Sequence, residues 1–305
     1  MTNRAMSSVL IVALMAAGCA GTPTQPGSGG AGRLKVVATF SILGDFVRSV
    51  GGDEIEVRVL VGPGGDAHEF APSPADGVAL AEAALVFENG LGFEPWLDDL
   101  YAASGSKAGR SVATEGIQPM SAAEEAGETD PHVWHDVTHA MQMVETIRAA
   151  LTQADPANAQ TYQANADAYI AELRELDAWV MPQVQTLPEA RRKLVTSHDT
   201  FSYFAARYGF EVVGTALGAA STEVADPAAG EIATLVEAIK ATGVPAIFAE
   251  NIANPRLMEQ IANEAGVQLA PTLYTDALGE PGSAGDTYLK LMRYNVTTIV
   301  AALSR

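Results

Sequence analysis

The chain has 305 residues, of which 48% are hydrophobic, so it is long enough for one large domain or for two ordinary ones with packed cores. Its 18 Lys and Arg against 37 Asp and Glu give a formal net charge of −19, which argues against binding to nucleic acid or to an anionic lipid surface. Cys19 is the sole cysteine, which excludes an intramolecular disulfide.

The N-terminal segment has the features of an export signal. Arg4 precedes VLIVALMAAG, an apolar run too short to span a membrane as a helix, and residues 1–18 are predicted to be a signal peptide. The segment resembles a bacterial lipoprotein signal, which implies that Cys19 is lipidated; ordinary cleavage that leaves a free thiol is the alternative. Residues 19–33 are small, polar or turn-forming and are predicted to be a flexible tether. We expect a soluble body held at a membrane face.

Strand and helix patterns alternate after the tether. LKVVATF (34–40), EIEVRVLVG (54–62) and ALVFENG (84–90) have the composition of buried strands. SILGDFVRSVGG (41–52) and PSPADGVALAEA (72–83) have helical patterns, the second with proline near its start. This alternation predicts β-α-β units with parallel strands.

The pattern repeats in the second half of the chain. KLVTSHDTFSYFAARYGF at 193–210 resembles KVVATFSILGDFVRSVGG at 35–52, and IFAEN at 247–251 resembles VFENG at 86–90. The offset is about 160 residues in both cases, and the two matches occur in the same order. We therefore expect two lobes of one architecture.

A long helix is predicted between the lobes. Asp155 can cap it, Pro156 can occupy its first position, and Pro182 is expected to kink or end it. Apolar residues at spacings of three and four extend over about 25 residues, roughly 40 Å of helix, which predicts a rigid connection and limited closure. The apolar stripe consists of Tyr162, Ala166, Tyr169, Leu173, Leu176 and Val180.

These patterns predict an α/β fold with parallel sheets in two similar lobes. The N-terminal lobe is expected at 34–153, the linking helix at 154–187 and the C-terminal lobe at 188–305.

Four side chains that can bind a metal follow predicted strands or precede predicted helices. His68 follows the strand at 54–62, His198 follows the strand that begins at residue 193, and Asp276 follows GVQLAPTLY. His132 lies in DPHVWHD, before a helix expected to start at the N-cap Asp136. Ligands of such lobes bind beyond the carboxyl ends of the strands, and three imidazoles with one carboxylate complete a tetrahedral zinc shell. Two ligands from each half predict an ion between the lobes.

Two further histidines lie close to His132. His135 and His139 have the i, i+4 spacing that can hold a metal on a helix. We interpret them instead as surface residues or as outer partners of the site, because the sequence offers no third ligand for them.

The loop before His132 is acidic. We interpret it as a solvated acidic loop; the alternative is that it concentrates cations weakly, in which case deletion of 121–129 slows zinc loading. Its acidic residues are Glu124, Glu125, Glu128 and Asp130.

With these motifs the chain resembles the metal-specific solute-binding lipoproteins of bacterial zinc and manganese ABC importers. The matching stretches are GGDAHEFAPSP around His68, DPHVWHD around His132, TSHDTFSYFAARYGF around His198, IFAEN at 247–251 and LYTDALG around Asp276. They span nearly the whole mature chain in the family's order. The resemblance implies two lobes joined by one long helix, with the metal in the cleft held by these three histidines and Asp276.

The resemblance also implies a cargo and partners. Histidine at position 198 is common among zinc binders of the family, so zinc is the expected metal, with manganese or iron as the alternative. The expected partners are the permease and ATPase of an ABC importer, and the protein is expected to be a monomer rather than an enzyme. Affinity should fall as the pH drops through about 6.5, because imidazoles must lose protons to bind a metal.

Two other classes of protein fit the sequence less well. A zinc hydrolase could use three histidines and a water, but Asp276 would fill the open position and no HExxH motif is present. A tethered acidic domain could also serve as a surface adhesin, although the sequence offers no aromatic-rich patch for that role.

Overall fold

A computed structural model describes residues 1–2, 32–122, 129–217, 221–222 and 227–305. Cys19, most of the signal peptide and tether, and the acidic residues Glu124, Glu125 and Glu128 lie outside the described residues. Among the helices that are described, none has the length and apolar character needed to cross a membrane.

Four parallel strands form the sheet of the N-terminal half, in the order β2-β1-β3-β4. β1 (Leu34–Phe40) lies between β2 (Ile55–Val61) and β3 (Leu85–Glu88), and β4 (Gly109–Val112) forms the far edge. The central strands β1 and β3 are buried on both faces because helices cover both sides of the sheet. This confirms the parallel units expected from the sequence.

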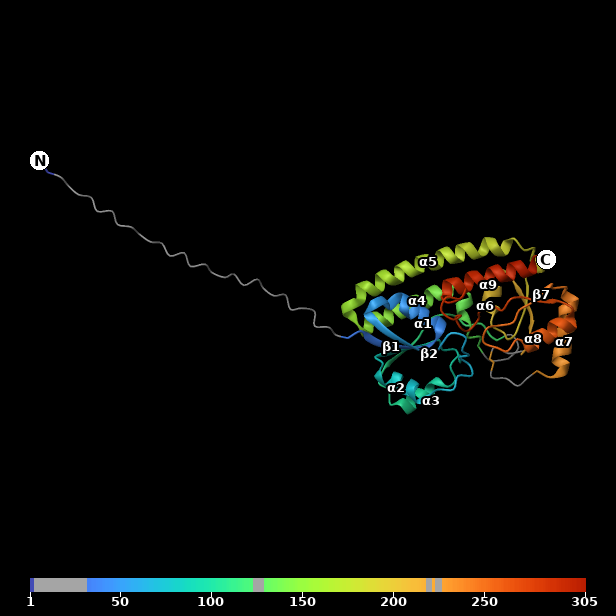
Figure 1. The fold of residues 1–305 in the computed structure, drawn as a ribbon, viewed down its shortest axis with the longest axis horizontal. Coiled ribbons are helices and arrows are strands. Elements are labelled where there is room, and N and C mark those ends of the chain that lie inside the picture. Colours follow the sequence, from blue (N-terminus) through green and yellow to red (C-terminus); the bar gives the residue numbers. More distant parts are fainter. Residues whose placement is uncertain (3–31, 123–128, 218–220, 223–226) are drawn as a thin grey trace. The chain divides into compact units, whose positions relative to one another are not determined.

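The helices of this half lie on opposite faces of the sheet. α1 (Ser41–Gly51) and α4 (Val137–Ala154) share the main core with β1 and β3, whereas α2 (Pro74–Glu82) and α3 (Leu97–Ser104) pack on the other face (Figure 1). The capping box of Ser73 starts α2 directly before its proline, as the pattern predicts.

The C-terminal half repeats this topology with shorter strands. β5 (Lys193–Thr196) pairs with β6 (Glu211–Thr215), and β7 (Ala246–Ile247) pairs with β8 (Gln268–Leu269), all in parallel. The backbone N–H of Phe248, directly after β7, donates to a carbonyl of β5 at 3.0 Å. The resulting order β6-β5-β7-β8 corresponds to β2-β1-β3-β4, which agrees with the repeat in the sequence.

The helices of the C-terminal half also flank their strands. α7 (Ala229–Thr242) and α8 (Arg256–Ala265) form a small core with one face of β5 and β7. α6 (Ser202–Tyr208) and α9 (Tyr288–Leu303) belong instead to the main core, which they share with α1, α4 and the N-terminal sheet. One hydrophobic core therefore extends through both halves.

The predicted long helix is α5 (Ala159–Gln185), whose 27 residues correspond to about 40 Å. It runs along both halves and packs on α1, α4 and α9 (Figure 1), and all six residues of the predicted stripe are buried. The predicted start was wrong by three residues, because the Asp155 backbone N–H still donates to Leu151 of α4 and Pro156–Asn158 forms a 3₁₀ turn. Pro182 lies inside the helix near its end and does not terminate it.

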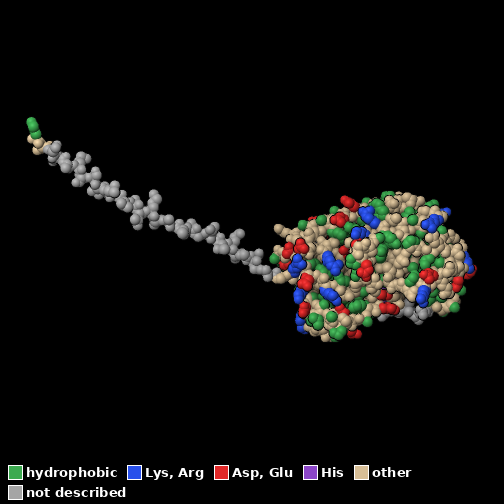
Figure 2. Space-filling view, in the orientation of Figure 1, with side chains coloured by type: hydrophobic (Ala, Val, Ile, Leu, Met, Phe, Trp, Pro, Cys, Tyr) green, Lys and Arg blue, Asp and Glu red, His purple; other side chains and the backbone are tan. Residues whose placement is uncertain are grey.

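The surface of residues 33–305 carries charges of both signs. Acidic and basic side chains are interspersed over the face shown in Figure 2. The exact lobe boundaries given above stay predictions.

Candidate metal centre

His68, His132, His198 and Asp276 come together, and all four are buried. Their ligand atoms lie within 4.8 Å of one another. His132 Nε2 lies 3.3 Å from Nε2 of both His68 and His198. Asp276 Oδ2 lies 3.4 Å, 3.6 Å and 3.0 Å from Nε2 of His68, His132 and His198, respectively.

Five of the six distances between these four ligand atoms fit a tetrahedral ion. Four donors placed 2.0–2.1 Å from a central zinc lie about 3.3 Å from one another. The five quoted distances between ligand atoms scatter around that value. Asp276 Oδ2 is buried, and the three imidazole Nε2 atoms are its neighbours within the described part of the chain, so a cation shared with these nitrogens is a partner that its position suits.

The elements that position the ligands differ from the simple strand-end prediction. His198 lies two residues after β5, as expected. His68 lies seven residues after β2, in a turn where the Asp66 carboxylate accepts the His68 backbone N–H at 2.8 Å. The strand expected in GVQLAPTLY is shorter than predicted, since only the two residues of β8 form it. Asp276 comes after it, three residues beyond an isolated parallel bridge between Glu250 and Leu273. Loops therefore carry the donors beyond the strands.

Two buried carboxylates hold the outer nitrogens of two ligands. Asp130 Oδ1 accepts the backbone N–H of His132 at 2.9 Å and lies 2.8 Å from its ring Nδ1. Glu250 Oε2 lies 2.5 Å from Nδ1 of His198, while Oε1 accepts the backbone N–H groups of Ser197 and His198. A carboxylate that accepts Nδ1–H leaves the Nε2 lone pair for a metal.

Neither carboxylate was identified from the sequence as a partner of the site. The interpretation of Asp130 as part of a solvated loop was wrong, since its side chain is fully buried. The available signal was its place two residues before His132. For Glu250 the signal was its position in the repeated motif at 247–251, after a buried strand.

A comparison with known families identifies the chain. The family model described as "Zinc-uptake complex component A periplasmic" matches residues 36–302. The chain belongs to this family. It is therefore an extracytoplasmic metal-binding protein, one of the substrate-binding lipoproteins of ABC importers. This result confirms the resemblance found in the sequence.

Individual relatives cover almost the whole of this substrate-binding protein. The manganese-binding lipoprotein MntA of Halalkalibacterium halodurans is 39% identical over 298 residues, 97% of each chain. The iron-binding protein YfeA of Yersinia pestis is 33% identical over 88% of this chain and 85% of its own. The periplasmic zinc binding protein TroA from Treponema pallidum has a similar structure, with a TM-score of 0.84 and 32% identity over 90% of this chain and 100% of that one. This likeness confirms the two-lobed α/β fold.

The protonation of the ligand histidines in this binding protein depends on burial and on the nearby carboxylates. Burial opposes protonation of His132, but attraction to Asp276 and the hydrogen bond with Asp130 outweigh it and raise the pKa of His132 to about 9. Burial likewise opposes protonation of His198, but Glu250 and Asp276 raise its pKa well above the ordinary value. Burial lowers the pKa of His68. Protons therefore compete with a metal ion for the nitrogens of His132 and His198.

The two remaining histidines lie outside the ligand cluster. His135 is fully buried against Phe201 and Trp134, with ring centroids 4.7 Å and 5.7 Å away, so its interpretation as a surface residue was wrong. Within the described residues neither of its ring nitrogens has a hydrogen-bond partner. His139 is half-buried in α4 and its ring contacts Tyr203. The predicted N-cap is confirmed, because the Asp136 carboxylate accepts the second backbone N–H of α4 at 2.7 Å.

Proposed function

We propose that this protein captures zinc through His68, His132, His198 and Asp276 and delivers it to the permease of an ABC importer. The observation that supports the proposal is the buried cluster itself. Three buried Nε2 atoms converge on one buried carboxylate oxygen, at 3.0 to 3.6 Å from it.

The donor set favours zinc over the other candidates. Three imidazoles and one carboxylate suit zinc, whereas manganese prefers a site richer in oxygen. Manganese or iron is the second candidate, and the relatives named for manganese and for iron favour it. Competition titrations of zinc against manganese, on protein purified without added metal, distinguish the two.

Capture requires motion because all four ligands are buried. Entry and release of the ion need the loops of the two halves to separate. The core shared through α5 and α9 should keep that motion small. In this proposal the lobes at 34–153 and 188–305 move relative to each other about the helix at 154–187. The protein acts as a monomer.

The chain is proposed to act at the membrane through a lipid on Cys19. The permease and its ATPase are then the partners that receive the ion. Mass spectrometry of the mature N-terminus tests the anchor: an unmodified Cys19 thiol would contradict it.

A hydrolytic role fits the site less well. A catalytic zinc keeps a position for water, but here a fourth protein ligand, Asp276, faces the three histidines. X-ray absorption of the zinc form should show four protein donors; a bound water would favour catalysis. An adhesin is the other class of function, and unchanged growth of a deletion strain under zinc limitation, with redundant uptake excluded, would favour it.

The ligand assignment is tested by zinc titration of His198→Ala. We expect affinity to fall by at least about 100-fold, because the shell loses one of four donors. His139→Ala is the matched control, since His139 lies outside the cluster, and it should bind zinc like the wild type. Unaltered affinity in His198→Ala would contradict the assignment.

A further inference from the structure

The two carboxylate oxygens of Asp276 have different surroundings. Oδ2 faces the three histidines, at 3.0 Å from the nearest Nε2. Oδ1 accepts a hydrogen bond from the Thr200 hydroxyl at 3.2 Å. Thr200 and Asp276 are both fully buried. One oxygen is thus available to an ion and the other is already bound by the protein.

The turn that carries a ligand also fixes the Thr200 hydroxyl. The Thr200 backbone N–H donates to the His198 carbonyl at 3.1 Å, and the Thr196 hydroxyl donates to the same carbonyl at 2.9 Å. Glu250 accepts the backbone N–H of His198. The position of the hydroxyl is therefore set by the turn that presents His198.

We propose that Thr200 determines metal specificity by keeping Asp276 monodentate. This inference rests on the proposed capture of a metal by the four-residue cluster. With Oδ1 engaged, the site supplies three nitrogens and one oxygen, the four-coordinate set of zinc. Manganese gains more from additional oxygen donors and from a higher coordination number. The hydroxyl thus withholds the fifth donor that manganese would use.

A bidentate Asp276 would have a cost in this site. Oδ1 would have to leave the Thr200 hydroxyl, which is buried and would lose its bond to a charged group. Valine has the shape of threonine without the hydroxyl, so Thr200→Val removes this cost and leaves Oδ1 free to approach the ion. Thr200 is a positioning residue, since it acts on the ion through Asp276.

The test compares wild type, Thr200→Val, Thr200→Ser and Thr234→Val. Each is titrated with zinc and manganese in competition, and the zinc forms are studied by X-ray absorption. Thr234 lies on the exposed side of α7, where its hydroxyl donates to the carbonyl of Gly230 in the same helix, so its substitution should change nothing at the metal site. Thermal unfolding of the metal-free proteins checks that all four fold.

We expect the ratio of zinc affinity to manganese affinity to fall about tenfold in Thr200→Val, the equilibrium effect of one hydrogen bond to a charged group. Zinc coordination should rise from four to five, and Thr200→Ser should retain the wild-type ratio. An unchanged ratio and coordination number in Thr200→Val, or a serine variant that behaves like valine, would overturn the inference. Wild-type protein that binds neither metal would instead overturn the proposed function, and this inference with it.

Discussion

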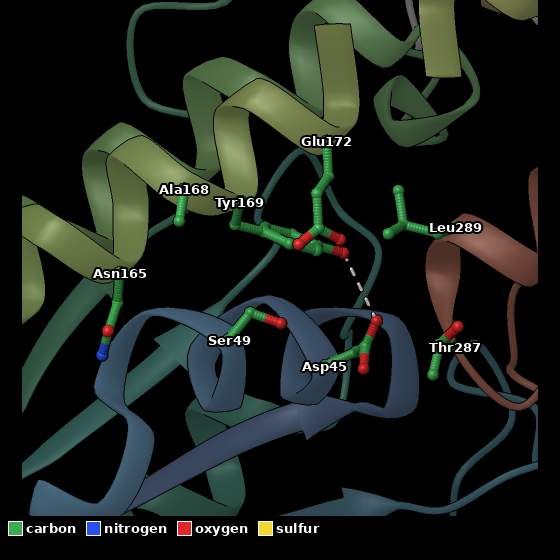
Figure 3. Close-up of a pocket in the computed structure, with 8 residues that line it drawn as sticks. All are labelled: Asp45, Ser49, Asn165, Ala168, Tyr169, Glu172, Thr287 and Leu289. Carbon is green, nitrogen blue, oxygen red and sulfur yellow. Dashed lines mark hydrogen bonds between the residues drawn. The ribbon is translucent and has the colours of Figure 1, made fainter. Parts of the chain in front are cut away.

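The carboxylate of Asp45 in α1 accepts the backbone N–H of Tyr288, the first residue of α9, at 2.9 Å, although 243 residues separate the two in sequence. The N–H groups of a first helical turn have no partner within the helix, so Asp45 satisfies one of them from the other half of the molecule, in addition to the N-cap Thr287. The Tyr169 hydroxyl of α5 lies 3.5 Å from the same oxygen, beside a cavity lined also by Thr287 (Figure 3). This contact connects both halves to the long helix.

Loss of the Asp45 carboxylate should weaken the fold. In Asp45→Ala we expect the free energy of unfolding to fall by about 1–2 kcal/mol, the usual effect of losing a helix cap. Asp45→Asn keeps an acceptor oxygen and should be spared most of this loss. Urea unfolding of the metal-free proteins measures both. An alanine variant as stable as the wild type would show that this contact does not stabilise the fold.

The same position should contribute to the pH dependence of stability. Burial raises the pKa of Asp45 and outweighs the hydrogen bond from Tyr288. The folded state then binds this proton more tightly than the unfolded state, so the contribution to stability decreases as the pH rises through the unfolded and folded pKa values. Asp45→Asn lacks this decrease, and its stability relative to wild type should improve from pH 3 to pH 7. If the stabilities of wild type and Asp45→Asn changed equally with pH, the raised pKa of Asp45 would be contradicted.

Glu250 should matter for metal affinity through His198. Glu250 accepts the Nδ1–H of His198 with one oxygen and two backbone N–H groups with the other. In Glu250→Gln one of these oxygens becomes an NH₂ group, which cannot accept. The imidazole of His198 then loses the Nδ1–H bond that leaves its Nε2 lone pair for the metal. We expect zinc affinity to fall about 10–100-fold with the fold retained. Glu259→Gln, on the exposed face of α8, is the matched control. Equal affinities for the two variants would exclude this role of Glu250.

Metal binding should release protons at neutral pH. The pKa values of His132, raised to about 9, and of His198, raised above its ordinary value, favour protonated imidazole in the metal-free site near neutral pH. Zinc should therefore displace protons from these imidazoles, and affinity should already fall as the pH drops below about 9, rather than only below 6.5. Calorimetry in buffers of different ionisation enthalpy counts the protons. Binding without proton release at pH 7.5 would contradict these shifts.

His135 should make the fold sensitive to acid. Burial lowers the pKa of His135 to about 3, so below pH 6.5 the unfolded chain takes up a proton that the folded chain refuses. This contribution to stability is present above about pH 6.5 and is lost as the pH falls toward 3. His135→Phe should reduce the slope of stability against pH in that window by up to about 1.4 kcal/mol per unit. Identical slopes for the metal-free proteins would refute the prediction.

The four candidate ligands were predicted from their places beside predicted strands and from the family resemblance. The repeated α/β pattern, the long amphipathic helix and the N-cap at Asp136 were predicted from local patterns in the chain. These features follow from periodicity and from bonds between near neighbours, which adjacent residues encode. Even there, the start of α5 was misplaced, because the sequence of Asp155 and Pro156 suits either the end of one helix or the beginning of the next.

The groups that surround the ligands could not be predicted from such local patterns and are known from the folded structure. The contact between Thr200 and Asp276 spans 76 residues, the contact between Glu250 and His198 spans 52, and that between Asp45 and Tyr288 spans 243. His135 is buried because Phe201 from the other half covers it. No periodicity in the chain encodes such pairings, since they arise where two separately patterned halves meet and exclude water. The ligands could be named from the sequence, but the environment that should tune them exists only in the folded protein.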